Sequence, residues 1–579
     1  MILMKKTYIL ILILIQILIL CCPCLGAQII GQEVAYLQTD RTSYIAGESV
    51  FYKFYVLNAD TKKPSDISDV GYVLVRAANS APSLKLRIKI NSGAATGSFD
   101  LPDTLSTGVY QIVAFTSAMK NFGEQNFSYK EIVVANRFDK EQNLKIPNLI
   151  PADTNATKQT NVLLPEIKTN KEVYALREKV TVSLGKTNFK GNVAVTVFEE
   201  PKITLPEKSI AEILNKPLVG LIDNRHLTNS YLPEKGGKIL RGRVIDVTTK
   251  KTIQSAMVLL SCVDSVPNLQ YASTDPNGLF QLLLSDYYNG KELFLSIKNV
   301  PDNQQWKIEI EDEFALSEKW SPSLTLDNNS YKEFVAKSQD IVYVNKSYQL
   351  NNDAIENPIS GQQLICPQLY HCPVKTVLPS DFVPLNDFRE IAVEILPSVR
   401  IYKDNGKYRV QVFNDFQQQF FYTDPVIFLD GVFVDDIKKI IGLGSEEIKK
   451  IDIINAERAF GDLVFQGVIS ITSKSNEIEN TKPASHSLRL KNDKVNKGRD
   501  FVAVNPDLNP NQNIPYFKQL LYWNPNLELN GIDSTNFEFY TSDNAAGFII
   551  KVEGVLENGM PIYSMSRIQV ENQIKATDK

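Results

Sequence analysis

The cysteines and histidines are the residues of this chain best suited to nucleophilic, redox or metal chemistry. There are six cysteines and three histidines among 579 residues. Cys366 and Cys372 lie close together and could close a small disulfide loop in an oxidising compartment. Cys262 lies in an apolar, strand-like run and is expected to be a buried thiol. The histidines are scattered and zinc-type spacing is absent, so no metal and no other cofactor is expected.

Motifs that carry enzyme chemistry are missing from the sequence. A GxSxG elbow, an HExxH helix, a phosphate-binding glycine loop and a dinucleotide fingerprint are all absent. Acidic pairs such as Asp435-Asp436 are typical of solvated faces or helix starts. The sequence therefore predicts a protein that is not an enzyme and has no catalytic residues.

A dense aromatic run offers a binding alternative to catalysis. It contains Phe413, Phe416, Phe420, Phe421 and Tyr422. Such a run could form a hairpin edge that packs on a neighbouring core. It could also form an exposed aromatic surface for a partner or a glycan.

The N-terminus has the pattern of an export signal. Lys5 and Lys6 precede an apolar core over residues 8–20, and cleavage sites follow Gly26 and Ala27. Two alternatives stay open. The uncharged run 7–27 could be a permanent anchor, or a cysteine at position 21, 22 or 24 could carry a lipid, although the lipobox is poor.

Length and composition indicate a multidomain globular protein. The length suggests three to five domains, and 43% hydrophobic with 22% charged residues is a globular composition. The formal net charge is −4 and no basic domain stands out, so nucleic acid is not an expected partner.

An internal repeat organises the first part of the chain. Residues 37–50 read LQTDRTSYIAGESV and residues 167–180 read IKTNKEVYALREKV. The two copies share a threonine, a tyrosine, a glutamate and a valine in register, which is consistent with a turn before a strand. Short strands separated by Gly, Pro and Asp follow the first copy, with the spacing of an antiparallel sandwich. The pattern resembles macroglobulin-like β-sandwich domains of the α-2-macroglobulin superfamily.

That resemblance raises the question of a thioester. Macroglobulins form one from Cys-Gly-Glu-Gln, whereas this chain has Phe122-Gly123-Glu124-Gln125. Without the cysteine no thioester can form, so the segment is interpreted as a turn between strands. No covalent trapping of amines or proteases is expected.

Residues 238–284 resemble the carboxypeptidase regulatory-like domain, a small transthyretin-like sandwich. The matching features are LRGRVID at 240–246, alternating apolar residues at 253–260 and a TD–G–F turn at 274–280. The resemblance implies a structural or adhesive role without peptidase zinc ligands.

Residues 424–475 resemble the plug domain of TonB-dependent outer-membrane receptors. Two strand-like runs, 391–395 and 408–412, lead into this segment. Within it a strand leads to the turn Asp430-Gly431, a helix start is expected at 445–447, and strands follow at 451–454 and 468–472. Phe460-Gly461 and Gly467 occupy the further turns. Only 104 residues follow position 475, too few for a receptor barrel of about 22 strands. The module is therefore expected to expose its surface to water or to a partner, with these turns in a structural or docking role.

The predicted fold is mainly β and multidomain, with macroglobulin-like and transthyretin-like β-sandwiches and a small α+β plug-like domain. Strands near the C-terminus are hypothesised to complete the second sandwich. The predicted segments are 1–27 signal peptide, 28–136 first macroglobulin-like sandwich, 137–159 linker, 160–236 second macroglobulin-like unit, 237–300 regulatory-like sandwich, 301–385 unassigned, 386–475 plug-like domain, 476–514 linker and 515–579 C-terminal β segment.

This combination resembles envelope proteins of the Bacteroidetes group. It implies an exported, periplasmic or outer-membrane-associated binding or scaffold protein, with an outer-membrane protein or complex as partner. Two alternatives remain: an accessory component of TonB-dependent nutrient import that acts with a separate β-barrel, and a macroglobulin-type defence protein that lacks the thioester.

Overall fold

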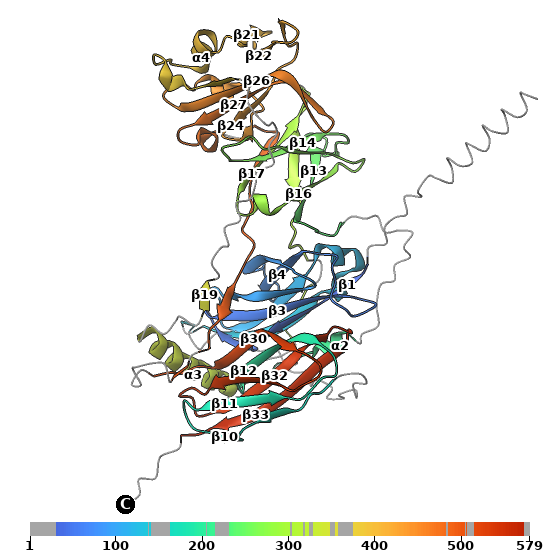
Figure 1. Ribbon diagram of the computed structural model, residues 1–579, viewed down its shortest axis with the longest axis vertical. Helices are drawn as coiled ribbons and strands as arrows, with labels where there is room; N and C mark the ends of the chain where they lie inside the picture. Colours follow the sequence, from blue (N-terminus) through green and yellow to red (C-terminus); the bar gives the residue numbers. More distant parts are fainter. Residues whose placement is uncertain are drawn as a thin grey trace, which may run out of the picture.

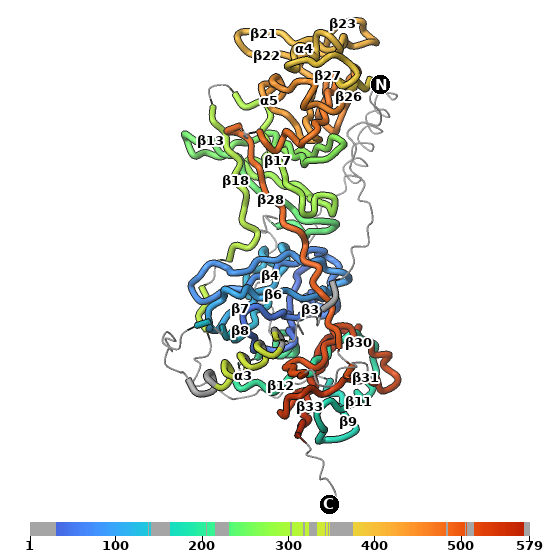
Figure 2. Tube along the Cα trace, turned by 90° about the vertical axis from the view of Figure 1, so that its left-hand side faces the viewer, coloured from blue at the N-terminus to red at the C-terminus, as the bar shows by residue number. Residues whose placement is uncertain are grey.

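The protein is mainly β and forms an elongated stack of domains (Figures 1 and 2). The computed structural model describes residues 31–136, 138–139, 163–203, 205, 207–214, 231–301, 304–316, 319–322, 328–347, 354–356, 375–481, 484–503, 505–506 and 515–572. An α+β module lies at one end of the stack and a sandwich built with the C-terminal strands lies at the other (Figure 1). The predicted fold class is confirmed.

The first sandwich has a three-stranded sheet, β1-β3-β6, and a five-stranded sheet, β2-β8-β7-β4-β5. Alternating apolar positions and Gly or Asp turns specify most of these strands locally. Their apolar faces meet in one core around Phe54, Val73 and Ile112. The strands are β1 Glu33–Thr39, β2 Ser43–Ile45, β3 Ser49–Asn58, β4 Val70–Ala77, β5 Leu84–Lys89, β6 Ala94–Asp100, β7 Gly108–Phe115 and β8 Ser128–Ala135.

The second sandwich is built from two distant parts of the chain. Its sheets are β10-β33-β32-β12-β30 and β31-β11-β9, so four early strands pair with four strands near the C-terminus. The pairing is the one that the sequence hypothesis requires, and the domains between are inserted into this sandwich. The strands are β9 Ile167–Thr169, β10 Val173–Tyr174, β11 Lys179–Leu184, β12 Gly191–Glu199, β30 Leu520–Leu529, β31 Thr535–Tyr540, β32 Gly547–Leu556 and β33 Pro561–Val570.

The third sandwich has the sheets β16-β13-β18 and β15-β14-β17-β28. Two of its strands lie in segments predicted to be unassigned or a linker: β18 in 301–385 and β28 in 476–514. The linker prediction was wrong there because the apolar alternation of β28 is limited to two leucines, Leu488 and Leu490, within a polar stretch. The strands are β13 Lys238–Asp246, β14 Met257–Cys262, β15 Gln270–Ser273, β16 Leu279–Leu284, β17 Glu292–Lys298, β18 Trp306–Ile310 and β28 Ser487–Lys491.

The α+β module combines a mixed sheet, β20-β26-β27-β24-β25, with a small sheet, β21-β22-β23, and two short helices. A single core joins both sheets and helix α4. The elements are β20 Lys375–Val377, α4 Phe388–Ile395, β21 Val399–Asp404, β22 Lys407–Asn414, β23 Gln419–Phe420, β24 Val426–Leu429, β25 Val432–Phe433, α5 Lys438–Ile441, β26 Ile448–Phe460 and β27 Leu463–Ser473.

Two local predictions for this module were wrong. Residues 391–395, predicted as a strand, belong to α4, which Asp387 caps by accepting hydrogen bonds from two backbone N–H groups. The buried positions 388, 391, 392 and 395 follow a helical period. The helix expected at 445–447 is a turn, since β26 already begins at Ile448; the helix in this region is α5.

The segment 484–503 joins the two halves of the stack. After β28 it runs along the first sandwich, where the Asn496 N–H donates to the Arg87 carbonyl (2.7 Å) and Arg499 contacts Ser98. Its last strand, β29 (Arg499–Phe501), pairs with β19 (Ala354–Glu356). Helix α3 (Asn328–Ser347) lies beside the junction of the first two sandwiches, where Phe334 packs with Val133 of β8 and Lys337 pairs with Glu199 of β12 (Figures 1 and 2).

Candidate binding surface

The predicted turn Asp430-Gly431 faces the third sandwich. Its φ angles are +50° and +82°, the left-handed values that a two-residue hairpin needs between β24 and β25. The Asp264 N–H donates to the Asp430 carbonyl over 3.0 Å. A Cβ on Gly431 would lie 2.7 Å from the Asp264 carbonyl oxygen, so a side chain there would displace the third sandwich.

The Asp430 carboxylate fastens the end of β27 to this turn. It accepts hydrogen bonds from the Ser473 N–H (2.7 Å), the Ser473 hydroxyl (2.8 Å) and the Ile478 N–H (3.3 Å). The residue is 3% exposed. These contacts give Asp430 a structural part within the module.

The Phe460-Gly461 turn contacts the third sandwich as well. The Phe460 ring packs edge-on against Tyr271 of β15, with ring centroids 5.9 Å apart. The Tyr271 hydroxyl accepts a hydrogen bond from the Asp462 N–H (2.8 Å), while Gly467 lies against Val412 inside the module. The structure therefore brings the two turns to one intramolecular interface, and the surface left for a partner lies elsewhere on the module.

The cysteines and metal-ligating side chains are the remaining candidates. Cys366 and Cys372 lie outside the described residues. Cys262 is a buried cysteine whose sulfur lies 3.7 Å from the Tyr287 hydroxyl. Within the described ranges, no group of three or more His, Cys, Asp and Glu side chains is arranged to hold a metal ion.

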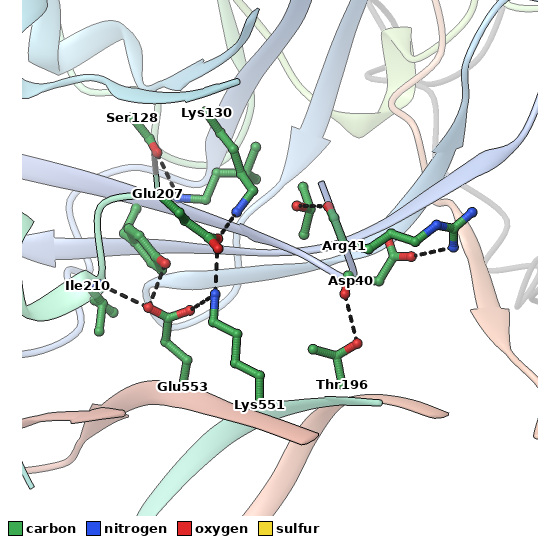
Figure 3. A network of polar contacts seen from close by, with 12 residues as sticks. Asp40, Arg41, Ser128, Lys130, Thr196, Glu207, Ile210, Lys551 and Glu553 are labelled. Carbon is green, nitrogen blue, oxygen red and sulfur yellow. Dashed lines mark hydrogen bonds and ion pairs between the residues drawn. The ribbon is translucent and has the colours of Figure 1, made fainter. Parts of the chain in front are cut away.

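A charge network joins the first two sandwiches (Figure 3). Its two lysines and Glu553 are buried, whereas the Glu207 side chain is 31% exposed. Glu207 lies between Lys130 of β8 and Lys551 of β32 and forms ion pairs with both. Lys551 also contacts Glu553 (3.1 Å), whose other carboxylate oxygen accepts hydrogen bonds from the Tyr36 hydroxyl (2.6 Å) and the Ile210 N–H (3.0 Å). Four segments far apart in the sequence therefore meet at one point.

The electrostatics of this network favour the ionised forms. Burial opposes ionisation of Glu207, but Lys130 and Lys551 hold its pKa well below the usual range. Burial likewise opposes the charge of Lys551, yet Glu553 and Glu207 raise its pKa above the usual value. Removing one partner would leave a buried charge without compensation, so the network fixes the relative position of the two sandwiches.

A second polar contact lies on the same interface. The Lys53 ammonium donates to both the carbonyl (3.0 Å) and the side-chain oxygen (2.6 Å) of Asn192 and to the Pro525 carbonyl (2.6 Å). Burial lowers the pKa of Lys53 to about 7. Apolar clusters that contain Tyr36 and Phe51 complete the interface.

Sequence reasoning missed this network because its members are distant in the sequence. One signal was available in GFIIKVEGVL at 547–556, where Lys551 and Glu553 interrupt an apolar strand. Charges spaced by two residues point to the same face of a strand, which indicates a polar interface on that face.

The α+β module exposes a disproportionate share of large apolar side chains. It holds 107 of the 456 described residues but seven of the sixteen large apolar side chains that are exposed among them. The seven are Leu378, Phe382, Val383, Val393, Phe416, Tyr422 and Val464. Phe416 is 96% exposed and Tyr422 is 78% exposed. The aromatic run thus divides: Phe421 enters the core, and Phe416 and Tyr422 face solvent.

The small sheet of this module presents an outer face of Arg and aromatic side chains. Its inner face packs Val399, Val410 and Val412 into the core. By strand alternation, Arg400, Tyr402, Gln411, Phe413 and Phe420 lie on the other face. Strands β21 and β22 and helix α4 lie at the end of the stack (Figure 1).

No helix in the described part of the chain is both long enough and apolar enough to cross a membrane.

Comparison with known proteins identifies the first sandwich. Residues 34–130 match the family model of the MG2 domain. No curated protein matches the chain. Among solved structures, trypsin-activated alpha-2-macroglobulin from Escherichia coli is 8% identical and has a TM-score of 0.24; the alignment covers 93% of this chain and 42% of the other. Salmonella alpha-2-macroglobulin reacted with methylamine is 9% identical and has a TM-score of 0.15; the alignment covers 93% of this chain and 24% of the other.

Two further similarities cover about half of the chain. The Yersinia pseudotuberculosis adhesin InvE is 9% identical with a TM-score of 0.12, and the alignment covers 48% of this chain and 58% of the adhesin. PorU from Porphyromonas gingivalis is 12% identical with a TM-score of 0.15, at 48% and 34% coverage.

The chain spans less than half the length of the alpha-2-macroglobulins it matches. TM-scores this low do not show a shared overall arrangement. The assignment rests on the MG2 match, which agrees with the two-sheet architecture of β1–β8. The first sandwich is therefore a macroglobulin-like MG2 domain.

Proposed function

We propose that this chain is a non-enzymatic, exported binding or scaffold protein of a Gram-negative cell envelope. Its α+β module attaches to an outer-membrane protein or complex, and the sandwiches hold that module at a distance. The signal-like pattern of residues 5–27 supports export.

The observation that carries the proposal is the concentration of exposed apolar side chains on the module. Isolated surface hydrophobics are ordinary, whereas a concentration on one domain is typical of an interaction surface. Seven of sixteen such side chains lie on this domain, and two of them, Phe416 and Tyr422, are aromatic residues in a single short segment.

The domain interfaces suit a scaffold. The charge network around Glu207 and Lys551 joins the first sandwich to the second. The turns at Asp430 and Phe460 join the α+β module to the third sandwich. Two domains whose interface buries ion pairs and the hydrogen-bonded backbone of turns resist sliding past each other, because any displacement leaves polar groups unpaired.

Covalent trapping is not part of the proposed function. The segment Phe122–Gln125 lies between β7 and β8, where the Gln125 amide donates to the Phe122 carbonyl (2.7 Å). A phenylalanine at position 122 has no thiol to acylate. A defence role of this chain would therefore have to be non-covalent.

Site-specific photocrosslinking in cells that make the protein tests the proposal. A benzoylphenylalanine at position 416 or 422 should give adducts with an outer-membrane protein. The same residue at Ile532 or Met565, which are exposed on the second sandwich, should give none. All four positions are solvent-exposed, so the substitutions should not disturb folding. If positions 416, 422 and 393 give no outer-membrane adduct, the proposed attachment is wrong.

A further inference from the structure

The outer face of the small sheet forms a continuous ladder of Arg and aromatic side chains. The Arg400 guanidinium lies over the Phe420 ring at 4.4 Å and near the Tyr402 ring at 5.4 Å. Phe420 packs edge-on against Phe413 with centroids 5.3 Å apart, and Arg400 donates a hydrogen bond to Gln411. We call Arg400, Tyr402, Phe413 and Phe420 the aromatic ladder.

These contacts hold the ladder in place before any partner arrives. Stacked rings and a hydrogen-bonded guanidinium lose little further conformational freedom on binding. Arg, Tyr and Phe are also the residue types enriched at the energetic centres of protein interfaces. Phe416 extends the surface, because it lies in the loop that joins β22 to β23.

The charge of this hairpin differs from that of the chain. Residues 399–414 contain four basic side chains, Arg400, Lys403, Lys407 and Arg409, and one acidic side chain, Asp404, in a chain of net charge −4. Asp424 pairs with Arg409 at 3.0 Å and leaves the excess basic. The complementary surface is acidic.

The backbone of β21 offers a second recognition element. In the described residues, β21 is the outer strand of its sheet and pairs with β22 alone. An outer strand can accept an extended segment through main-chain hydrogen bonds, with alternate side chains facing the sheet. Arg400 and Lys403 on this strand oppose pairing with a second copy of the same basic strand and favour an acidic one.

We propose that β21 and the aromatic ladder bind an extended, acidic protein segment whose alternate residues are apolar. The segment adds as a strand beside β21, places its apolar side chains against Tyr402 and the Arg400 stem at the near edge of the ladder, and turns its alternate carboxylates to the opposite face, where Lys403 lies. The inference rests on the proposed function and names the chemistry of its partner.

Synthetic peptides test the ladder without knowledge of the natural partner. Twelve-residue peptides that alternate Asp or Glu with Leu, Val or Phe are titrated against the full mature chain by fluorescence polarisation. Peptides with Lys and Arg in place of the acids, and peptides with alternate N-methylated backbone amides, serve as comparisons. We expect the acidic peptides to bind at least about tenfold more tightly than either comparison.

Substitutions on the chain provide the matched controls. Arg400→Glu with Lys403→Glu should reverse the charge preference, and Tyr402→Ala should weaken binding of the acidic peptides about tenfold. Arg567→Glu and Ile532→Ala change exposed residues of the second sandwich and should leave binding unchanged. Equal binding of all three peptide types, or no effect of the charge reversal, would overturn the inference.

The remaining outcomes separate the inference from the proposed function. Binding to vesicles of phosphatidylglycerol and phosphatidylethanolamine, or to a glycan array, without binding of acidic peptides would refute a protein segment as ligand. In cells, adducts from a photocrosslinker at position 393 but not at position 402 would support the proposed attachment and reject the aromatic ladder as the attachment surface. Adducts from neither position would reject both.

Discussion

The two copies of the repeated motif, residues 37–50 and 167–180, share one hydrogen-bond pattern and differ in charge. In the first copy, the Asp40 side chain accepts from the Tyr44 hydroxyl (2.8 Å) and the Phe51 N–H (2.9 Å). In the second, the Asn170 side-chain oxygen accepts from the Tyr174 hydroxyl (2.8 Å) and the Thr181 N–H (3.0 Å).

The basic and acidic positions correspond in the same way. Arg41 pairs with Glu48 at 2.8 Å, and Lys171 pairs with Glu178. In each copy the glutamate also accepts a backbone N–H, from Ile45 or from Ala175. The motif thus encodes a local turn that both sandwiches use before their first long strand.

The difference between the copies follows their surroundings. Asp40 is fully buried, and its carbonyl accepts a hydrogen bond from Thr196 of the second sandwich (2.8 Å; Figure 3). Asn170 is exposed. A neutral amide suffices where the turn faces water, whereas the turn at the domain interface contains an Asp–Arg pair. The comparison indicates that the charged version serves the interface and the shared hydrogen bonds serve the turn.

Among the substitutions considered, alanine at the shared acceptor position, Asp40 or Asn170, should give the largest difference in stability loss between the two copies. Asp40→Ala leaves the Phe51 N–H buried without an acceptor, leaves the Tyr44 hydroxyl only the Arg41 carbonyl (2.7 Å), and takes one partner from Arg41. Such losses cost about 4 kcal/mol of folding free energy. Asn170→Ala removes equivalent but exposed bonds and should cost about 1 kcal/mol. Hydrogen exchange of the β3 and β11 amides would measure each domain separately. Equal losses would mean that burial does not distinguish the copies.

The pH dependence of stability should also distinguish them. Burial raises the pKa of Asp40 to about 6, against the opposing effect of Arg41. An unfolded aspartate has a pKa of about 3.9, so the folded state binds the proton more tightly. The resulting stabilisation is complete below about pH 4 and is lost as the pH rises through about 6.

Asp40→Asn isolates this contribution, because an amide can keep both hydrogen bonds, as Asn170 does. Between pH 4 and pH 8 the wild type should lose up to about 3 kcal/mol relative to this variant. The reciprocal change, Asn170→Asp, should add little pH dependence at an exposed position. Denaturant titrations at several pH values would show both trends. A constant difference between wild type and Asp40→Asn would contradict the expected shift.

The paired tyrosines test the hydrogen bonds with less disturbance. Tyr44→Phe removes a buried hydroxyl that donates to a carboxylate, which should cost about 2 kcal/mol. Tyr174→Phe removes a hydroxyl that donates to an amide, which should cost about 1 kcal/mol. Both tyrosine rings are fully buried, so the loss of packing is the same in the two variants. If Tyr174→Phe lost more folding free energy than Tyr44→Phe, the charge of the acceptor would not determine the strength of this hydrogen bond.

Elements specified by local sequence signals, such as the repeated turn, could be predicted from the sequence. Local signals specified most strands of the first sandwich and the left-handed turn at Asp430-Gly431. They failed at α4, where an apolar run was interpreted without its cap at Asp387. They also failed at β28, whose pairing with β17 is set by contacts distant in sequence.

The interfaces lay beyond sequence reasoning for the same reason. Glu207, Tyr36 and Lys551 belong to three distant segments, and no spacing rule relates them. The turns at Asp430 and Phe460 were predicted as turns with a structural or docking role, but their contact with Asp264 and Tyr271 depends on the fold. Of the binding surface, the aromatic run was visible in the sequence, whereas the place of Arg400 beside Phe420 required the pairing of three strands.

The smallest expected effect concerns the exposed ion pair of the second copy. The Lys171 side chain is 54% exposed, so water and salt screen its attraction to Glu178. Holding two long side chains together also costs conformational entropy, which offsets much of the gain. Lys171→Met should therefore change stability by less than about 0.5 kcal/mol, and the change should shrink further in 0.5 M NaCl. Arg41→Met is the matched variant in the first copy: it leaves the buried Asp40 carboxylate without its cation and should cost several times more. Urea denaturation of both variants at low and high salt would compare them. If Lys171→Met proved as costly as Arg41→Met, the charge at this position would serve the turn itself, and the interface would no longer explain why the two copies differ.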